Sequence, residues 1–255
     1  MIQADYSKIP GKIWLNGKYI PTKNANIHIL SHSIHFASAV FEGIRVYNYK
    51  AFLLDKHLKR FKKSSNILDY EIPFKINKLK NICNKIIKLN NLKNGYLRPI
   101  AWRGTESMAP TNLKSKIGVA IAGWDWPVYY SKNAKLNGIS LCVSNWKRPP
   151  KDTSPGESKC SGLYQICTLA KHDASRRGFD DALMLDLNSN ITETTSSNIF
   201  FIKNKKIYTP KIRNFLNGIT RQTVISLIKK NKINFLEKDI KINELKSFES
   251  AFITG

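Results

Sequence analysis

The fold class is decided by residues 41–68, which read FEGIRVYNYKAFLLDKHLKRFKKSSNIL. Two runs rich in apolar and β-branched residues, 41–47 and 51–54, predict a pair of short strands. Asp55 then stands where the N-cap of a helix belongs. The apolar face of that helix is expected at Leu58, Phe61, Ser65 and Leu68, which recur at helical spacing. Strands followed by a helix in this way indicate an α+β protein.

The same pattern continues on both sides of this stretch. Asn16-Gly17 predicts a tight turn between two strands within 12–20. Further strands are expected at 95–102, 117–124, 139–144, 181–187, 191–195, 199–202 and 207–208, and further helices at 75–92, 161–177 and 220–230. We therefore expect a two-domain α+β fold, with a small N-terminal domain at 1–125, an interdomain loop at 126–137 and a larger C-terminal domain at 138–255.

Length and composition narrow the class of protein. The chain has 255 residues, 42% of them hydrophobic, which excludes a disordered or collagen-like chain. No apolar run approaches the roughly 18–20 residues of a membrane-spanning helix. The first residues lack a basic segment followed by an apolar stretch, so no signal peptide is predicted. We expect a cytoplasmic protein without a membrane partner.

The charge is strongly positive, with 42 Lys and Arg against 18 Asp and Glu, or +24. A basic chain is typical of nucleic-acid binding, but only 9 of these cations are Arg, the residue that groove-reading proteins favour. Lys, Asn and Ile together fill 88 of the 255 positions, a bias expected of an AT-rich genome. No nucleic-acid partner is therefore predicted, although a non-catalytic basic binding protein stays open as an alternative.

Cysteine and histidine spacing predicts no metal site. Cys83, Cys142, Cys160 and Cys167 form no CxxC pair and are typical of reduced intracellular thiols. His32 and His35 stand three residues apart without a third ligand nearby, so both are interpreted as structural.

Six ordered segments stand out from the rest of the chain, at residues 31–45, 57–61, 96–99, 158–164, 191–200 and 216–221. They read SHSIHFASAVFEGIR, HLKRF, YLRP, SKCSGLY, ITETTSSNIF and LNGITR. In order and spacing they resemble the branched-chain amino acid aminotransferases, members of the fold-type IV family of pyridoxal-phosphate enzymes. The resemblance implies a fold-type IV architecture with pyridoxal 5'-phosphate between two domains. It implies ping-pong transfer of the amino group between Leu, Ile or Val and 2-oxoglutarate.

D-amino acid aminotransferases and aminodeoxychorismate lyases share that fold and cofactor, and remain as alternatives. In all of them a lysine amine forms a Schiff base with the cofactor and then shuttles a proton. By resemblance Lys159 is this lysine, and Glu193 keeps the ring nitrogen of the cofactor protonated. Tyr164 is expected to hydrogen-bond the 3′-oxygen of the cofactor.

The resemblance also assigns the residues that bind the cofactor phosphate. Arg60 matches the family's phosphate arginine. Gly218, Ile219 and Thr220 precede a predicted helix, so their backbone N–H groups and the Thr220 hydroxyl would meet the phosphate at a helix N-terminus.

The substrate pocket implied by the resemblance accepts both aliphatic side chains and the carboxylate of glutamate. Arg98 matches the arginine that binds this carboxylate. Glu42 and Arg45 are interpreted as an ion pair that supports the site. The pocket walls are expected from Phe41, Tyr96, Trp126, Tyr129 and Tyr164, with Phe36 contributed across a dimer interface. The expected partners are thus small amino and 2-oxo acids and further copies of the chain in a homo-oligomer.

The sequence departs from the family in a few places. Family members continue beyond Gly255 with a turn that contacts the phosphate and the substrate carboxylate. The chain is therefore expected to be either a fragment of a longer one, which we favour, or a truncated and impaired enzyme. Ala37 and Ser161 stand where glycine is common, and Asn217 where proline is common. Phe36 stands where tyrosine is common and lacks the hydroxyl that could reach the opposite site.

Overall fold

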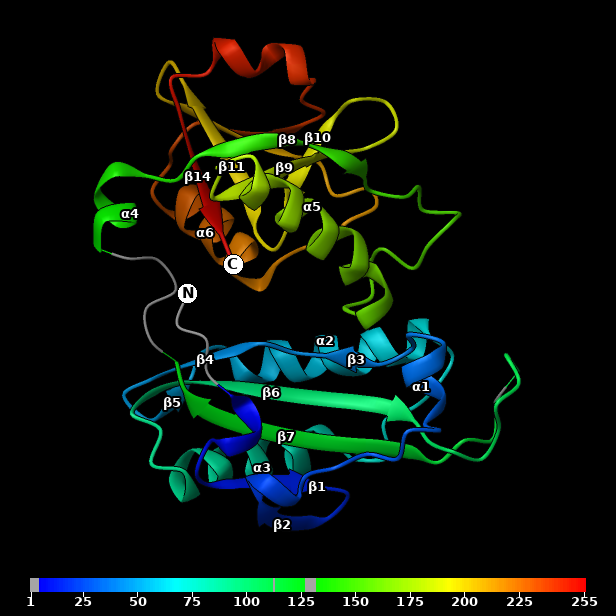
Figure 1. The fold of residues 1–255 in the computed structure, drawn as a ribbon. Coiled ribbons are helices and arrows are strands. Elements are labelled where there is room, and N and C mark those ends of the chain that lie inside the picture. The colour runs from blue at the N-terminus through cyan, green and yellow to red at the C-terminus, as the bar shows by residue number, and fades with distance from the viewer. Residues whose placement is uncertain (1–4, 112, 127–131) are drawn as a thin grey trace. The chain divides into compact units, whose positions relative to one another are not determined.

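The computed structural model describes residues 5–111, 113–126 and 132–255 (Figure 1). The chain forms two compact units. The N-terminal unit lies within Met1–Ser131 and Ser158–Gly162, and the C-terminal unit comprises Lys132–Glu157 and Leu163–Gly255. The expected domain limits at 125 and 138 stay a prediction, and part of the expected interdomain loop falls outside the described residues.

The N-terminal unit is built on an antiparallel sheet with strand order β2-β1-β7-β6-β4-β5, with β3 paired to β6. Its strands are β1 (Lys12–Leu15), β2 (Lys18–Pro21), β3 (Val40–Phe41), β4 (Ile44–Tyr47), β5 (Lys50–Ala51), β6 (Asn94–Arg103) and β7 (Ile117–Asp125). Its helices are η1 (Tyr6–Lys8), η2 (Thr22–Asn24), α1 (His32–His35), α2 (Leu54–Ile67) and α3 (Ile76–Leu89). The predicted turn is confirmed, because Asn16 and Gly17 both have positive φ and join β1 to β2.

The two long helices of this unit pack on the sheet through their apolar faces. Leu58 and Phe61 of α2, and Leu79 and Ile86 of α3, are fully buried, as their helical spacing predicts. The predicted N-cap at Asp55 is wrong. The N-cap is Leu53, in the left-handed region at φ 47°, and Asp55 lies in the first turn, where an acidic side chain interacts favourably with the helix dipole.

Alternation along β6 gives the two faces of the sheet different roles. Leu97 is fully buried. A Cβ added at Gly123, its neighbour on β7, would touch both the Leu97 side chain and the Ile86 side chain of α3. The face of the sheet that carries Leu97 is therefore the face that meets the helices. Tyr96 and Arg98 alternate with Leu97 and are only partly buried. They therefore lie on the opposite face.

The C-terminal unit is built on a second sheet, with strand order β13-β12-β11-β10-β9-β8 and β14 paired to β11. Its strands are β8 (Leu141–Lys147), β9 (Asp181–Leu185), β10 (Ile191–Thr194), β11 (Asn198–Lys203), β12 (Lys206–Pro210), β13 (Phe235–Lys238) and β14 (Ser250–Thr254). Its helices are α4 (Lys132–Asn137), α5 (Tyr164–Arg176), α6 (Ile219–Lys230) and η4 (Ile242–Ser247), while η3 (Ser161–Leu163) leads into α5. α4 lies in the segment for which a loop is expected.

One face of this second sheet is covered by α5 and α6. Met184 packs in a cluster with residues of α5, and Phe200 packs in a cluster with residues of α6. In the register of the sheet, Met184 pairs with Glu193, and Glu193 pairs with Asn198. Asn198 lies two residues before Phe200, so these four side chains lie on one face. The carboxylate of Glu193 is thus on the face that α5 and α6 cover. Within the described residues, no helix has the length and apolar character needed to span a membrane.

Candidate active site

Lys159 is held in the N-terminal unit by backbone hydrogen bonds to two elements. The Phe41 N–H of β3 donates to the Lys159 carbonyl oxygen at 3.1 Å, and the Lys159 N–H donates to Ser64 Oγ of α2 at 2.9 Å. Ser158 Oγ donates to the Ser64 carbonyl oxygen at 2.9 Å. The Lys159 side chain is partly buried, and its Nζ lies 4.9 Å from the centre of the Phe41 ring. The backbone of Lys159 is therefore held by β3 and by α2.

Arg60 lies on the same stripe of α2 as Ser64 and His57, because residues three and four apart share one face of a helix. This stripe meets Glu42, which follows β3 and is fully buried. Arg60 Nε and Nη2 donate to the two carboxylate oxygens of Glu42 at 2.6 and 2.8 Å. His57 Nδ1 lies 2.7 Å from Glu42 Oε2. Glu42 thus orients the guanidinium of Arg60 with a bidentate contact.

The charge of Glu42 is maintained by these partners. Burial would raise the pKa of Glu42, but the hydrogen bonds and charges of Arg60 and His57 outweigh burial and lower that pKa to about 2. The expected ion pair of Glu42 with Arg45 is wrong. Arg45 Nη1 donates instead to the Trp126 carbonyl oxygen at 3.4 Å, since the alternation of the strand directs Glu42 and Arg45 to different faces.

Aromatic side chains and Arg98 form a cluster on the open face of the N-terminal sheet. The Arg98 guanidinium carbon lies 4.8 Å from the centre of the Phe41 ring and 5.3 Å from that of Tyr96. Arg98 Nη2 donates to Tyr96 Oη at 3.4 Å, and the Tyr96 and Trp126 ring centres are 5.0 Å apart. Gly43 is required beside them, because an added Cβ would overlap with the Tyr96 hydroxyl. Among the described residues Arg98 has no carboxylate partner.

Phe36 and the remaining pocket residues are placed differently. Phe36 is 41% exposed and stacks on His32, with ring centres 4.4 Å apart. Tyr129 lies outside the described residues. Tyr164 begins α5 in the C-terminal unit, where it is partly buried. The structure therefore brings Phe41, Tyr96, Arg98, Trp126 and Lys159 into one unit, separately from Tyr164.

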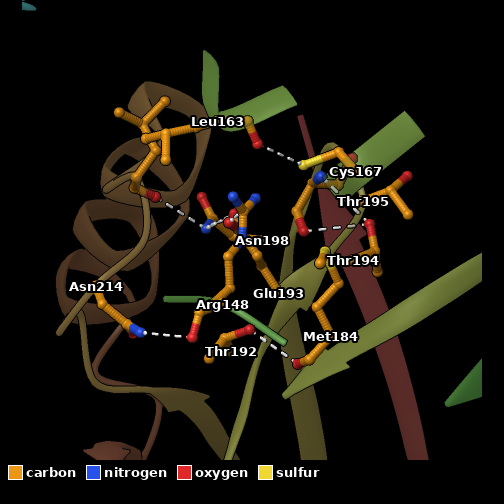
Figure 2. A network of polar contacts seen from close by, with 12 residues as sticks. Arg148, Leu163, Cys167, Met184, Thr192, Glu193, Thr194, Thr195, Asn198 and Asn214 are labelled. Atoms are coloured by element: carbon orange, nitrogen blue, oxygen red, sulfur yellow. Dashed lines mark hydrogen bonds and ion pairs between the residues drawn. The ribbon is translucent and has the colours of Figure 1, made fainter. Parts of the chain in front are cut away.

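Glu193 forms a buried ion pair in the C-terminal unit (Figure 2). Arg148 Nη2 lies 2.5 Å from Glu193 Oε1, and both side chains are less than a tenth exposed. Burial would lower the pKa of the Arg148 guanidinium, but the charge of Glu193, with smaller effects of Cys167 and Tyr164, outweighs burial and raises this pKa. A guanidinium at this distance favours the ionised form of the Glu193 carboxyl.

Two asparagines hold this pair in place (Figure 2). Asn214 Nδ2 donates to the carbonyl oxygens of Arg148 and Pro149 at 3.3 and 2.6 Å. Asn198 Nδ2 lies 3.4 Å from Glu193 Oε2 and 3.1 Å from the Leu216 carbonyl oxygen. Asn198 of β11 therefore links Glu193 to the turn before α6, and Asn214 links the segment after β12 to the loop that carries Arg148.

The turn at Gly218 leads directly into α6. Gly218 is the N-cap and provides no side-chain hydrogen bond to the first turn. The first N–H groups of this 12-residue helix thus form an electropositive end suited to an anion such as phosphate. Ile219 is buried, and the Thr220 hydroxyl donates to the Gly255 backbone oxygen at 3.2 Å. The phosphate-binding role of Gly218, Ile219 and Thr220 stays a prediction.

Sequence reasoning missed Arg148, Asn198 and the link from Glu42 to Arg60. The only signal for Arg148 is that it is one of just nine arginines, in a loop rich in Pro and Ser. Glu42 follows Phe41 directly in an expected strand, so the two side chains should point to opposite faces of the sheet. This alternation could have indicated that the partner of Glu42 lies on a helix. Among the described residues, no cluster of three His, Cys, Asp or Glu side chains could hold a metal ion. His32 and His35 instead contact the carbonyl oxygens of Ala109 and Ile29.

Comparison with known proteins places these features in a family. The family described as Amino-transferase class IV matches residues 39–255. A probable branched-chain-amino-acid aminotransferase of Rickettsia felis is 38% identical over 244 residues, which cover 95% of this chain and 82% of that protein. The branched-chain-amino-acid aminotransferase of Pseudomonas aeruginosa is 33% identical over 249 residues, or 96% of this chain and 81% of that protein.

Solved structures of the same kind of enzyme are similar. A branched-chain amino acid aminotransferase from T.th., solved with pyridoxamine 5'-phosphate, has a TM-score of 0.93 at 33% identity over 97% of this chain and 83% of that one. The branched-chain amino acid aminotransferase of Escherichia coli has a TM-score of 0.92 at 30% identity, over 96% of this chain and 83% of that one. These matches confirm the expected fold class and the expected kind of enzyme. The chain belongs to the class IV aminotransferase family.

Proposed function

We propose that this aminotransferase uses pyridoxal 5'-phosphate to move the amino group between Leu, Ile or Val and 2-oxoglutarate. One observation carries the substrate proposal. The centre of the Phe41 ring lies 4.9 Å from the amine of Lys159 and 4.8 Å from the guanidinium carbon of Arg98. The Phe41 ring is an apolar wall that suits an aliphatic side chain. Arg98, which has no carboxylate partner among the described residues, suits the carboxylate of a glutamate-type substrate.

Each unit would supply its own groups to the cofactor. Arg60, oriented by Glu42, and the N-terminus of α6 would hold the phosphate, with the N–H groups of Ile219 and Thr220 as donors. Glu193 would face the ring nitrogen and Tyr164 the 3′-oxygen. When bound, pyridoxal phosphate supplies an electron sink that stabilises negative charge on the substrate Cα.

The protein's own residues manage the protons. The Lys159 amine would attach to the cofactor, and the amino group of the substrate would then displace it. The released, neutral amine would remove the proton from the substrate Cα as a general base. Glu193, kept ionised by Arg148, would hold a proton on the pyridine nitrogen. Similarity to branched-chain aminotransferases over more than nine tenths of the chain supports these roles.

Covalent trapping tests the proposal. Treatment of the protein with pyridoxal phosphate and then borohydride should attach the cofactor to the peptide that contains Lys159, detected by mass spectrometry, and Lys159→Ala should remove the label. L-leucine with 2-oxoglutarate should then yield glutamate, while D-alanine and aminodeoxychorismate should not react. Labelling elsewhere would contradict the lysine assignment, and preference for D-alanine would contradict the substrate class.

We also infer a cytoplasmic homo-oligomer of at least two chains. Its support is an exposed apolar surface along one segment, formed by Ile27, Ile29, Leu30, Ile34 and Phe36. Contiguous exposed side chains of this kind are typical of protein–protein contacts. Light scattering should give a mass of at least twice 29.1 kDa, and the mass of a single chain would refute the oligomer.

A further inference from the structure

Asn198 occupies a central position in the C-terminal unit, with contacts that extend beyond Glu193. Its side chain is 5% exposed and lies on β11, opposite Glu193 in the register of the sheet. Nδ2 lies 3.4 Å from Glu193 Oε2 and donates to the Leu216 carbonyl oxygen at 3.1 Å. Oδ1 accepts a hydrogen bond from the Gly218 N–H at 3.0 Å. One amide therefore contacts the Glu193 carboxylate (Figure 2) and both ends of the turn before α6.

The contact with Gly218 explains why this residue is a glycine. Gly218 has φ −58° and ψ 141°, which any residue adopts without strain. A Cβ added at Gly218 would nevertheless overlap with Asn198 Oδ1. The nearest atom of any other residue, Arg221 Cβ, would lie at an ordinary 3.6 Å from it. The missing side chain is thus required by the asparagine alone. The turn and the asparagine are fitted to one another.

We propose that Asn198 is a positioning residue that holds the carboxylate of Glu193 and the N-terminus of α6 at a fixed spacing. This inference rests on the proposed function, in which those two groups meet the ring nitrogen and the phosphate of one cofactor. Because a short linker joins the pyridine ring of the cofactor to its phosphate, the distance between these groups varies only within a limited range. A loose spacing of their protein partners would therefore weaken the contacts at both ends. Arg148 acts on the other oxygen of Glu193 and does not contact the turn through any hydrogen bond among the described residues.

Binding measurements on the full chain test this role. The proteins are wild type, Asn198→Ala, Gly218→Ala and the double variant, with Asn84→Ala as the control because Asn84 is exposed on α3. The ligands are pyridoxal phosphate, pyridoxal and inorganic phosphate, and urea unfolding checks the fold of each variant. Asn198→Ala should weaken pyridoxal phosphate binding about tenfold, because the side-chain hydrogen bonds to Glu193, Leu216 and Gly218 are lost. It should also weaken both pyridoxal and phosphate, and Asn84→Ala should change none of them.

The double variant separates positioning from a general loss of stability. Gly218→Ala should weaken pyridoxal phosphate binding at least tenfold in the wild-type background, but by less than about twofold when Asn198 is already alanine. The inference would be overturned if the double variant lost affinity by the product of the two single-variant factors. It would also be overturned if Asn198→Ala lost affinity for only one of pyridoxal and phosphate. Unchanged binding in Asn198→Ala would overturn it too while leaving the proposed function intact. A wild-type protein that does not bind pyridoxal phosphate would overturn both.

Discussion

Glu42→Gln tests whether the buried charges of the N-terminal unit are as strongly coupled as their geometry indicates. Burial alone would raise the pKa of Glu42, yet the Arg60 and His57 contacts hold it at about 2, against an ordinary 4.5. A carboxyl with a lower pKa in the folded state stabilises the fold at pH values above 4.5, and this stabilisation is lost as the pH falls toward 2. A shift of this size corresponds to about 3 kcal/mol at pH 7.

Urea unfolding followed by tryptophan fluorescence measures this contribution. Four of the five tryptophans, Trp14, Trp102, Trp124 and Trp126, lie in the N-terminal unit with Glu42, so the signal reports mainly on that unit. The free energy of unfolding of Glu42→Gln should be about 3 kcal/mol below that of wild type at pH 6. Because glutamine does not titrate, the difference should narrow by about 2 kcal/mol at pH 3.

Glu71→Gln is the matched control for this measurement. The Glu71 side chain is 78% exposed and lies 3.4 Å from Lys62, and such surface pairs contribute little. Its unfolding free energy should stay within about 0.5 kcal/mol of wild type at both pH values. A difference between Glu42→Gln and wild type that is equally large at pH 6 and pH 3 would refute the reasoning, because the loss would then come from packing.

Three further replacements have expected outcomes. Arg98→Leu should raise KM for 2-oxoglutarate at least tenfold and change KM for L-leucine by less than about threefold in steady-state assays, because only the former loses a charged hydrogen bond. Arg148→Met should lower the unfolding free energy by about 3–5 kcal/mol, measured by circular dichroism, since it removes the cation next to the buried Glu193 carboxylate. Ala37→Gly should raise the free energy of unfolding by up to about 1 kcal/mol, seen as a higher midpoint of thermal unfolding. Ala37 has φ 50°, in the left-handed region where glycine is less strained than alanine.

Much of the fold could be predicted from the sequence because its signals are local. Asn16-Gly17 and Asn204-Lys205 both adopt the positive φ values that tight hairpins require. The spacing of apolar residues located α3 and α6 to within a few residues. The strands β13 and β14 were missed, because each pairs with a strand that is remote in the sequence. Phe235 of β13 pairs with Ile207, and Phe252 of β14 pairs with Phe200. No local pattern encodes these partners.

The candidate site was less predictable than the fold. Motif order alone selected Lys159 among 33 lysines, and local physics offered no reason to prefer it. The partner of Glu42 was assigned to Arg45, three residues away, whereas the structure pairs it with Arg60. Arg148 is 45 positions from Glu193, and only the fold of the second sheet brings the two together. Side-chain pairings across elements were therefore the part that sequence could not supply.

Stability does not explain why each unit buries a carboxylate against an arginine. Removing both charges from water costs several kcal/mol each, and apolar side chains of similar size often stabilise a protein as well or better. The two pairs differ in which member faces the proposed ligand. In the first, Glu42 fixes Arg60, the cation proposed for the phosphate. In the second, Arg148 maintains the charge of Glu193, the anion proposed for the ring nitrogen. Each pair thus keeps one charge oriented and ionised before any ligand binds, so that binding does not have to supply the energy of arranging it.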